Sequence, residues 1–184
     1  MESKSQESGA FVESQEFRIE HFIPVNGQSL RPHDAAAALL IREDGSYIMQ
    51  LRDGMAGIFY PGHWGCFGGA VEPGETPVDA LKRELREEIE FEMPEATRFT
   101  QFDFDFSPLG YPKVYRTYFE VLVPDMAFRR LILHEGADVQ AFRGENLLTT
   151  RRVTPYDAFA VWMHLNRQRL LSARNGHASG FLCP

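Results

Sequence analysis

Short stretches of the chain alternate between apolar and polar positions, and this period of two predicts β-strands. In the stretch 99–106, Phe102, Phe104 and Phe106 alternate with Asp103 and Asp105, so we expect one buried and one wet face. Glu43-Asp44-Gly45-Ser46 separates two apolar runs and is typical of a hairpin. The stretches that favour strands are 17–23, 35–41, 47–51, 64–72, 99–106, 114–123, 131–133 and 139–142.

Two stretches follow the period of a helix instead. In the first, apolar residues recur at i, i+3, i+7 and i+11, at Val78, Leu81, Leu85 and Ile89. Thr76-Pro77-Val78-Asp79 is typical of a helix start, with Thr76 as the cap. The second begins with a similar Thr-Pro-x-Asp sequence at 154–157 and is expected to end near 174. Strands with two helices, without regular alternation, indicate an α/β fold layered around a mixed sheet.

Three glutamates share a second stripe of the first helix. Glu84, Glu87 and Glu88 stand at i, i+3 and i+4, beside the apolar stripe, so they project together. Like charges at this spacing repel, and a hard divalent cation such as Mg²⁺ relieves the repulsion through carboxylate oxygens. The simpler interpretation is a solvated helix face, which many glutamate-rich helices present.

Length and composition fit one domain. The chain has 184 residues and 43% hydrophobic residues, enough for a sizeable core. We place the domain at 17–174, with a flexible N-terminal tail at 1–16 and a C-terminal tail at 175–184. The formal net charge is −7, so a nucleic acid polymer is not an expected partner.

The cysteines and the apolar runs of the sequence indicate the cellular compartment. The only cysteines are Cys66 and Cys183, which form no disulfide framework and suit a reducing compartment. Cys66 is interpreted as a small buried hydrophobe. We find no apolar run long enough for a membrane span, and the polar residues 1–14 do not resemble a signal peptide. The expectation is a cytoplasmic protein without a membrane partner.

The segment Gly69 to Phe91 carries the most specific signal. It reads GAVEPGETPVDALKRELREEIEF and resembles the Nudix box, G-x5-E-x7-R-E-U-x-E-E-x-G-U, where U is bulky and apolar. Glu90 stands where the family has its second glycine, which leaves the end of the helix open to question. The preceding Gly68-Gly69 turn supplies the strand–loop–helix context of the motif and weighs against a solvated face.

The resemblance implies a fold and an activity. The expected fold is a mixed β-sheet packed between helices, an α/β/α sandwich. The expected enzyme is a pyrophosphohydrolase that needs Mg²⁺ or Mn²⁺ and cleaves the diphosphate of a small nucleoside diphosphate derivative, such as a nucleoside triphosphate or nucleotide sugar. A homodimer is compatible with this family. Two alternatives stay open: a non-catalytic Nudix module that senses a nucleotide or metabolite, and a plain acidic interaction domain.

The resemblance also assigns roles by position. The metal ligands are the Glu84, Glu87 and Glu88 carboxylates and the Gly68 carbonyl. Arg83 orients its acidic neighbours, or alternatively pairs only with Glu87 as a structural contact. Gly69 and Glu75 support the site. The candidate for a further acid, as ligand or base, is Glu135 in the 134–136 turn, and the alternative is a solvated side chain.

The residues that recognise the substrate are not evident. Aromatic candidates for stacking on a base, each of which is also a candidate for core packing, are Tyr60, Trp64, Phe102, Tyr115 and Phe142. Candidates for phosphate contact are Arg52, Lys113 and Arg116. The stretch 58–64 matches no substrate-specific signature.

Overall fold

A computed structural model describes residues 32–55 and 58–175 of the chain. The strand expected at 17–23 and the tail expected at 1–16 lie outside the described residues, as does all but the first residue of the tail expected at 175–184. Within them, no helix is long and apolar enough to cross a membrane.

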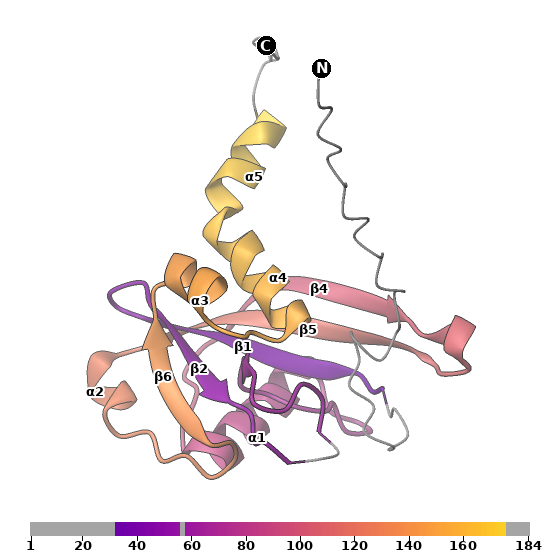
Figure 1. Cartoon of the computed structure of the whole chain (residues 1–184), viewed down its shortest axis with the longest axis horizontal. Helices are drawn as coiled ribbons and strands as arrows, with labels where there is room; N and C mark the ends of the chain where they lie inside the picture. The colour runs from indigo at the N-terminus through magenta and orange to yellow at the C-terminus, as the bar shows by residue number, and fades with distance from the viewer. Residues whose placement is uncertain (1–31, 56–57, 176–184) are drawn as a thin grey trace, which may run out of the picture.

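A mixed sheet forms the centre of the molecule (Figure 1). Its strands are β1 (Ala35–Arg42), β2 (Tyr47–Leu51), β3 (Trp64–Gly65), β4 (Thr97–Asp105), β5 (Lys113–Val123) and β6 (Asp138–Phe142). The order is β3-β2-β1-β5-β4, and β6 also pairs with β2. The β1–β5 pair is parallel, while every other strand pair is antiparallel.

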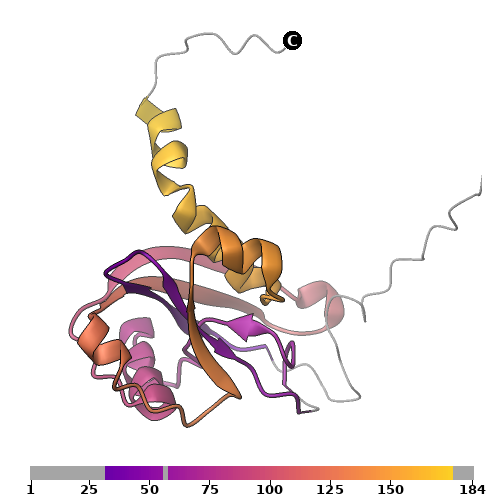
Figure 2. The ribbon, with the colours of Figure 1, turned by 60° about the vertical axis from the view of Figure 1, so that its left-hand side comes forward.

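Helices cover both faces of the sheet, which gives the expected sandwich. They are α1 (Pro77–Ile89), α2 (Asp125–Phe128), α3 (Gly144–Thr150), α4 (Pro155–Leu165) and α5 (Arg167–Asn175), and a 3-10 turn spans Ser107–Leu109. One core packs α1 against one face through Leu81, Leu85 and Ile89. A second core packs α3 and α4 against the other face, through Leu147 and Val161 (Figure 2).

Helix α1 starts as its sequence predicts. Thr76 is the N-cap, Pro77 is the first helical residue, and the Thr76 hydroxyl accepts a hydrogen bond from the Asp79 amide at 3.3 Å. The predicted hairpin joins β1 to β2, with Gly45 at φ 78° in its turn. Cys66 is buried, as expected of a small hydrophobe.

Several predictions of secondary structure were wrong. Segment 131–133 is a loop rather than a strand, because the Leu131 amide donates to the Phe128 carbonyl of α2 and the Ile132 amide donates to the Ile89 carbonyl at the end of α1. Helix α3 was not predicted, since its seven residues are too few to show a period. The expected last helix breaks at Asn166 into α4 and α5. Strand β3 covers only Trp64–Gly65, after which the chain crosses to β1 by isolated bridges.

Candidate active site

Helix α1 presents Glu88 to the backbone of the glycine turn. The Glu88 side chain is only 4% exposed, although it is a carboxylate on a helix surface. One of its oxygens accepts a hydrogen bond from the Gly68 amide at 3.0 Å, and the other accepts from the Gln50 side-chain amide at 3.4 Å. The carboxylate is therefore held in a fixed place between α1, the turn and β2.

The two glycines of the turn are required by close contacts. Gly68 has φ +123°, and a Cβ there would overlap the Ala36 carbonyl oxygen of β1. At Gly69, a Cβ would lie 2.5 Å from the Glu84 carboxylate. The Glu84 side chain thus rests directly against the turn, beside Glu88.

Arg83 forms hydrogen bonds with several of the acidic side chains next to the Gly68-Gly69 turn. Its guanidinium donates to both Glu75 oxygens, at 2.9 and 3.0 Å, and to the Ala70 carbonyl at 3.0 Å. It also donates to Glu84 at 2.7 Å and to Glu87 at 3.4 Å. Its contacts therefore include Glu87 but extend beyond a simple helix pair. The hydrogen bonds from Arg83 lower the pKa of the Glu75 carboxyl.

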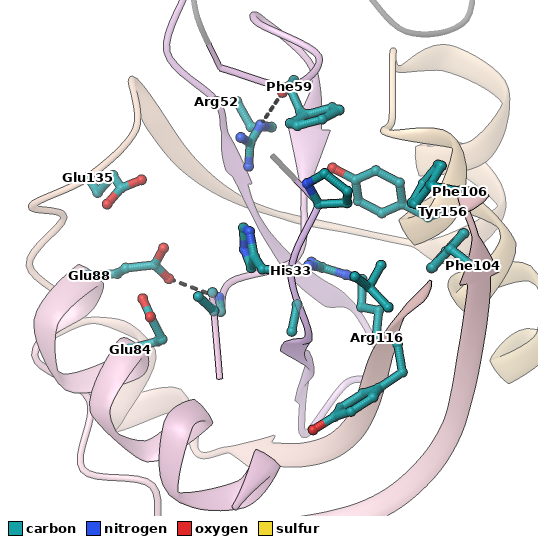
Figure 3. A pocket seen from close by; sticks show the side chains of 17 residues that line it. His33, Arg52, Phe59, Glu84, Glu88, Phe104, Phe106, Arg116, Glu135 and Tyr156 are labelled. Atoms are coloured by element: carbon teal, nitrogen blue, oxygen red, sulfur yellow. Dashed lines mark hydrogen bonds between the residues drawn. The ribbon is translucent and has the colours of Figure 1, made fainter. Parts of the chain in front are cut away.

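A cavity of about 370 Å³ is lined by Glu84 and Glu88 of α1 and by a loop that is distant in the sequence (Figure 3). Gly68, Gly69, Glu84 and Glu88 line it from one side, and Glu135 lines it from the loop before β6. Glu84, Glu88 and Glu135 point toward a common space in the close view. Glu87 does not line this cavity, and its side chain is 61% exposed at the edge of the site.

Hydrogen bonds fix the loop of Glu135 against the rest of the site. The His134 amide donates to the Glu88 carbonyl at 2.8 Å, and the Ala137 amide donates to the Leu51 carbonyl at 2.8 Å. Gly136 has φ +92°, and a Cβ there would lie 2.6 Å from the Gln50 side-chain oxygen. Glu135 therefore reaches the cavity from a loop tied to α1 and β2, and not from the end of a strand.

The departure from the box at Glu90 has a structural counterpart. Helix α1 ends at Ile89, and Glu90 adopts the left-handed conformation at φ 51° that a glycine would occupy more easily. Its carboxylate lies outside the cavity lining and contacts His134 Nε2 at 2.7 Å. Glu90 thus lies away from the acids that line the cavity, and the open question about the helix end is answered, since α1 ends one residue before it.

Burial and like charges act together on the cavity acids. Burial raises the pKa of Glu88 to about 8, and repulsion from Glu135 and Glu84 adds to the rise. Burial also raises the pKa of Glu84, while the Arg83 contact opposes this rise. Deprotonating these groups together is unfavourable unless a positive charge joins them.

The donor set suits a hard divalent cation. Carboxylate oxygens and a backbone carbonyl are ligands that Mg²⁺ and Mn²⁺ prefer, and a cation would relieve the repulsion that raises the Glu88 pKa. Among residues 32–55 and 58–175, no group of three His, Cys, Asp or Glu side chains is already arranged to hold a metal ion. The chemistry of these donors therefore fits a hard divalent cation.

The far side of the cavity is cationic and aromatic. Arg116 lies here, with its guanidinium 5.0 Å from the centre of the Tyr156 ring and 3.4 Å from Asp157. Arg52 also lines the cavity and donates to the Phe59 carbonyl at 2.7 Å. Lys113 is absent from the lining of this cavity and pairs with Asp105 instead.

The sequence did not reveal Asp157 as the centre of a polar network. Its buried carboxylate accepts hydrogen bonds from the Cys66 amide at 2.9 Å, the Tyr118 hydroxyl at 2.9 Å and the Thr154 hydroxyl at 2.7 Å. The Thr-Pro-x-Asp sequence was the available signal, but it indicated only a helix start.

The aromatic candidates lie in three different places. Trp64 and Phe142 are buried against each other with ring centroids 4.8 Å apart, so they pack in the core. Tyr115 lines the acidic cavity. Tyr60 and Phe102 line an adjoining groove.

Comparison with known proteins gives the family. A family model described as NUDIX domain matches residues 31–143. Nucleoside triphosphatase NudI of Escherichia fergusonii is 50% identical over 50 residues, which are 27% of this chain and 35% of that protein. Its Escherichia coli counterpart is 48% identical over 50 residues, with the same coverage. The match therefore spans about a third of the length of these relatives.

Solved structures share the fold at low sequence identity. The MutT protein from Methanosarcina mazei Go1 has a TM-score of 0.60 and 22% identity, over 77% of this chain and 99% of that one. The E. coli ORF135 protein has a TM-score of 0.58 and 22% identity, over 78% and 94% of the two chains. At this identity the likeness shows the fold alone.

Proposed function

Because the chain belongs to the NUDIX domain family, we propose that it is a pyrophosphohydrolase that requires Mg²⁺ or Mn²⁺. The substrate is a small molecule built on a nucleoside diphosphate, such as a nucleoside triphosphate or a nucleotide sugar. The bond it cleaves is the phosphoanhydride. The partial match to nucleoside triphosphatase NudI supports a triphosphate among these substrates.

The observation that carries the proposal is the buried Glu88 carboxylate in a cavity with Glu84 and Glu135. A solvated helix face would leave such side chains in water with ordinary pKa values. Here burial and repulsion raise the pKa of Glu88 to about 8, in a cavity that opens toward Arg52 and Arg116. One side thus suits a cation, and the opposite side suits an anionic phosphate.

The residues of the chain divide the chemistry between them. A bound Mg²⁺ supplies charge neutralisation of the diphosphate and acidifies water. Glu84, Glu88 and the Gly68 carbonyl would hold the cation, Glu87 would join them from the edge of the site, and Arg83 orients Glu84 and Glu87 through its hydrogen bonds. One cavity carboxylate, for which Glu135 is the candidate, accepts the proton of the attacking water. The water oxygen bonds to phosphorus, and the anhydride oxygen leaves with its electron pair on the departing phosphate.

The test is a phosphate-release assay with Mg²⁺ over a panel of nucleoside triphosphates and nucleotide sugars. Each quenched reaction is also separated by anion-exchange chromatography, so that nucleotide products, pyrophosphate and phosphate are all counted without a metal-dependent coupling enzyme. Turnover should vanish in EDTA and return with Mg²⁺ or Mn²⁺. Undiminished turnover after thorough chelation would contradict the metal requirement, and nucleotide binding without turnover would favour the sensor alternative.

Substitutions test the assignment of the acids. Glu88→Gln and Glu87→Gln should each lower kcat by about 10²–10⁴-fold, the range for loss of metal or acid–base help. Glu43→Gln is the matched control, because Glu43 is exposed in the β1–β2 turn. Normal kcat in both α1 variants would contradict the assignment of these two acids to the metal site.

A further inference from the structure

Gln50 of β2 is a buried polar side chain that the proposed chemistry does not use. Side chains alternate between the two faces of a strand, so Gln50 stands on the same face as Ile48, which packs in the core beneath α1. Met49 between them packs in the core on the opposite face. Gln50 is only 3% exposed, and burying an amide is costly unless it has polar partners. We therefore expect Gln50 to meet polar groups on the α1 face of the sheet.

The first polar partner of Gln50 is the carboxylate of Glu88. The Gln50 side-chain nitrogen donates to one Glu88 oxygen at 3.4 Å, and the Gly68 amide donates to the other oxygen at 3.0 Å. The two donors come from different elements, β2 and the glycine turn, and each carboxylate oxygen has its own donor. Loss of the Gln50 donor would therefore leave Glu88 free to rotate about its last bond while it stays buried.

The second neighbour of Gln50 is the loop that carries Glu135. A Cβ at Gly136 would lie 2.6 Å from the Gln50 side-chain oxygen, so a glycine is needed for the loop backbone to pass this close. The next amide, that of Ala137, donates to the Leu51 carbonyl of β2 at 2.8 Å. The loop thus lies directly against the Gln50 side chain, and Glu135 is one residue before the point of closest approach.

Gln50 contacts the supports of two cavity acids but does not line the cavity itself. Figure 3 shows the carboxylates of Glu88 and Glu135 on the same side of the cavity, the first on α1 and the second on the loop. The hydrogen bond from the His134 amide to the Glu88 carbonyl joins the two main chains. Gln50 differs from this backbone contact because it reaches the Glu88 carboxylate, which is the group that the chemistry needs.

We propose that Gln50 is a positioning residue, which holds the Glu88 carboxylate and the Glu135 loop in a fixed relation so that both acids serve the same divalent cation. Side chains that hydrogen-bond to a metal ligand fix its orientation, and their loss typically costs about 10- to 100-fold in metal affinity or activity. A neutral amide suits this place, because it donates to a carboxylate without adding a negative charge beside Glu84 and Glu88. This inference rests on the proposed metal-dependent hydrolysis and adds to it a residue outside the cavity.

Two substitutions separate the polar atoms of Gln50 from the length of its side chain. Gln50→Met keeps the length and removes the donor and the acceptor, whereas Gln50→Asn keeps the amide and is shorter by one methylene group. Each should weaken the binding of Mn²⁺ alone, measured by electron paramagnetic resonance, by about 10-fold, and should lower the Mg²⁺-dependent kcat by about 10- to 100-fold. KM should change by less than about threefold, because Gln50 does not line the cavity.

The matched control is Gln140→Met. Gln140 lies on the neighbouring strand β6, opposite Met49, and its side chain is exposed and does not line the cavity. Gln140→Met should keep the Mn²⁺ affinity, kcat and KM of the parent protein. If Gln50 served only to fill the core, Gln50→Met would lower the thermal midpoint but leave the Mn²⁺ affinity and kcat of the folded protein unchanged, and that result would overturn the proposal.

The Mn²⁺ titration separates this inference from the proposed function, because it does not depend on turnover. Mn²⁺ binding without hydrolysis by the parent protein would refute the proposed function, and a weaker Mn²⁺ affinity in both Gln50 variants would still support the role of Gln50. Hydrolysis by the parent protein, together with parent values of Mn²⁺ affinity and kcat in Gln50→Met and Gln50→Asn, would refute the role of Gln50 and leave the proposed function standing.

Discussion

At the scale of single residues, the site depends on contacts between backbone and carboxylate that have no room for a methyl group. Gly69 shows this most clearly, because its backbone needs no left-handed conformation and yet a Cβ would lie 2.5 Å from Glu84. The reason for a glycine there is therefore the neighbouring acid and not the turn. The sequence indicates the glycine, but only the structure supplies this reason.

Gly69→Ala should displace the Glu84 carboxylate and lower the Mg²⁺-dependent kcat by at least about tenfold, since small displacements of positioned groups are costly. The thermal midpoint should change by only a few degrees, because the clash falls on a side chain that can rotate. The control is Gly54→Ala, where a Cβ meets nothing within 4 Å. Equal kcat in the two variants would show that the Glu84 position is not critical.

At the scale of elements, α1 is the part that the sequence predicts best. Its cap, its apolar stripe and its acids are local features with the period of a helix, and they appear where expected. Helix α3 is too short to show a period, the break at Asn166 has no signal in the apolar pattern, and the loop at 131–133 is held by a hydrogen bond to α1 that no local pattern shows. Glu135 was a candidate from resemblance alone, because no local pattern shows a loop bound to α1 and β2.

The end of α1 gives a second prediction. Glu90→Gly should keep kcat within a few-fold, because the Glu90 side chain lies outside the cavity. Stability should change little, since relief of the left-handed strain of about 1 kcal/mol is offset by loss of the exposed His134 contact. A Mn²⁺ titration and thermal unfolding curves check these two expectations. A large loss of Mn²⁺ affinity would show that Glu90 is on the side of α1 that faces the metal site.

Asp157 gives a third prediction, because it joins α4 to the sheet. Asp157→Ala should lower the free energy of unfolding by about 3–5 kcal/mol, since Arg116 and several buried donors would lose their partner. Urea unfolding measures this loss. Asp53→Asn outside the network is the control, expected within about 0.5 kcal/mol of the parent protein. A similarly small change at Asp157 would mean that water replaces the carboxylate.

At the scale of the whole molecule, folding, protonation and metal binding are linked through Glu88. Its ordinary pKa of 4.5 rises to about 8 in the folded chain. Between these values the folded state binds a proton that the unfolded state releases, so stability should fall as the pH rises through this window. Above pH 8 the folded state holds an unfavourable buried charge, and a bound cation is expected to compensate for it.

The last prediction follows from this linkage. Without metal, in EDTA, the thermal midpoint should fall between pH 6 and pH 8.5, and Glu88→Gln should flatten that fall because its side chain does not ionise. Added Mg²⁺ should raise the midpoint, and the increment should grow with pH, since metal binding requires the deprotonated carboxylates. At a hundredfold excess over Kd, binding adds about 2.7 kcal/mol. For a chain of this size that is a shift on the order of 5–10 °C.

Scanning calorimetry of the parent protein and of Glu88→Gln at several pH values measures how the thermal midpoint changes with pH in each protein. An Mg²⁺ increment that is independent of pH, or equal in Glu88→Gln, would place the cation away from this carboxylate.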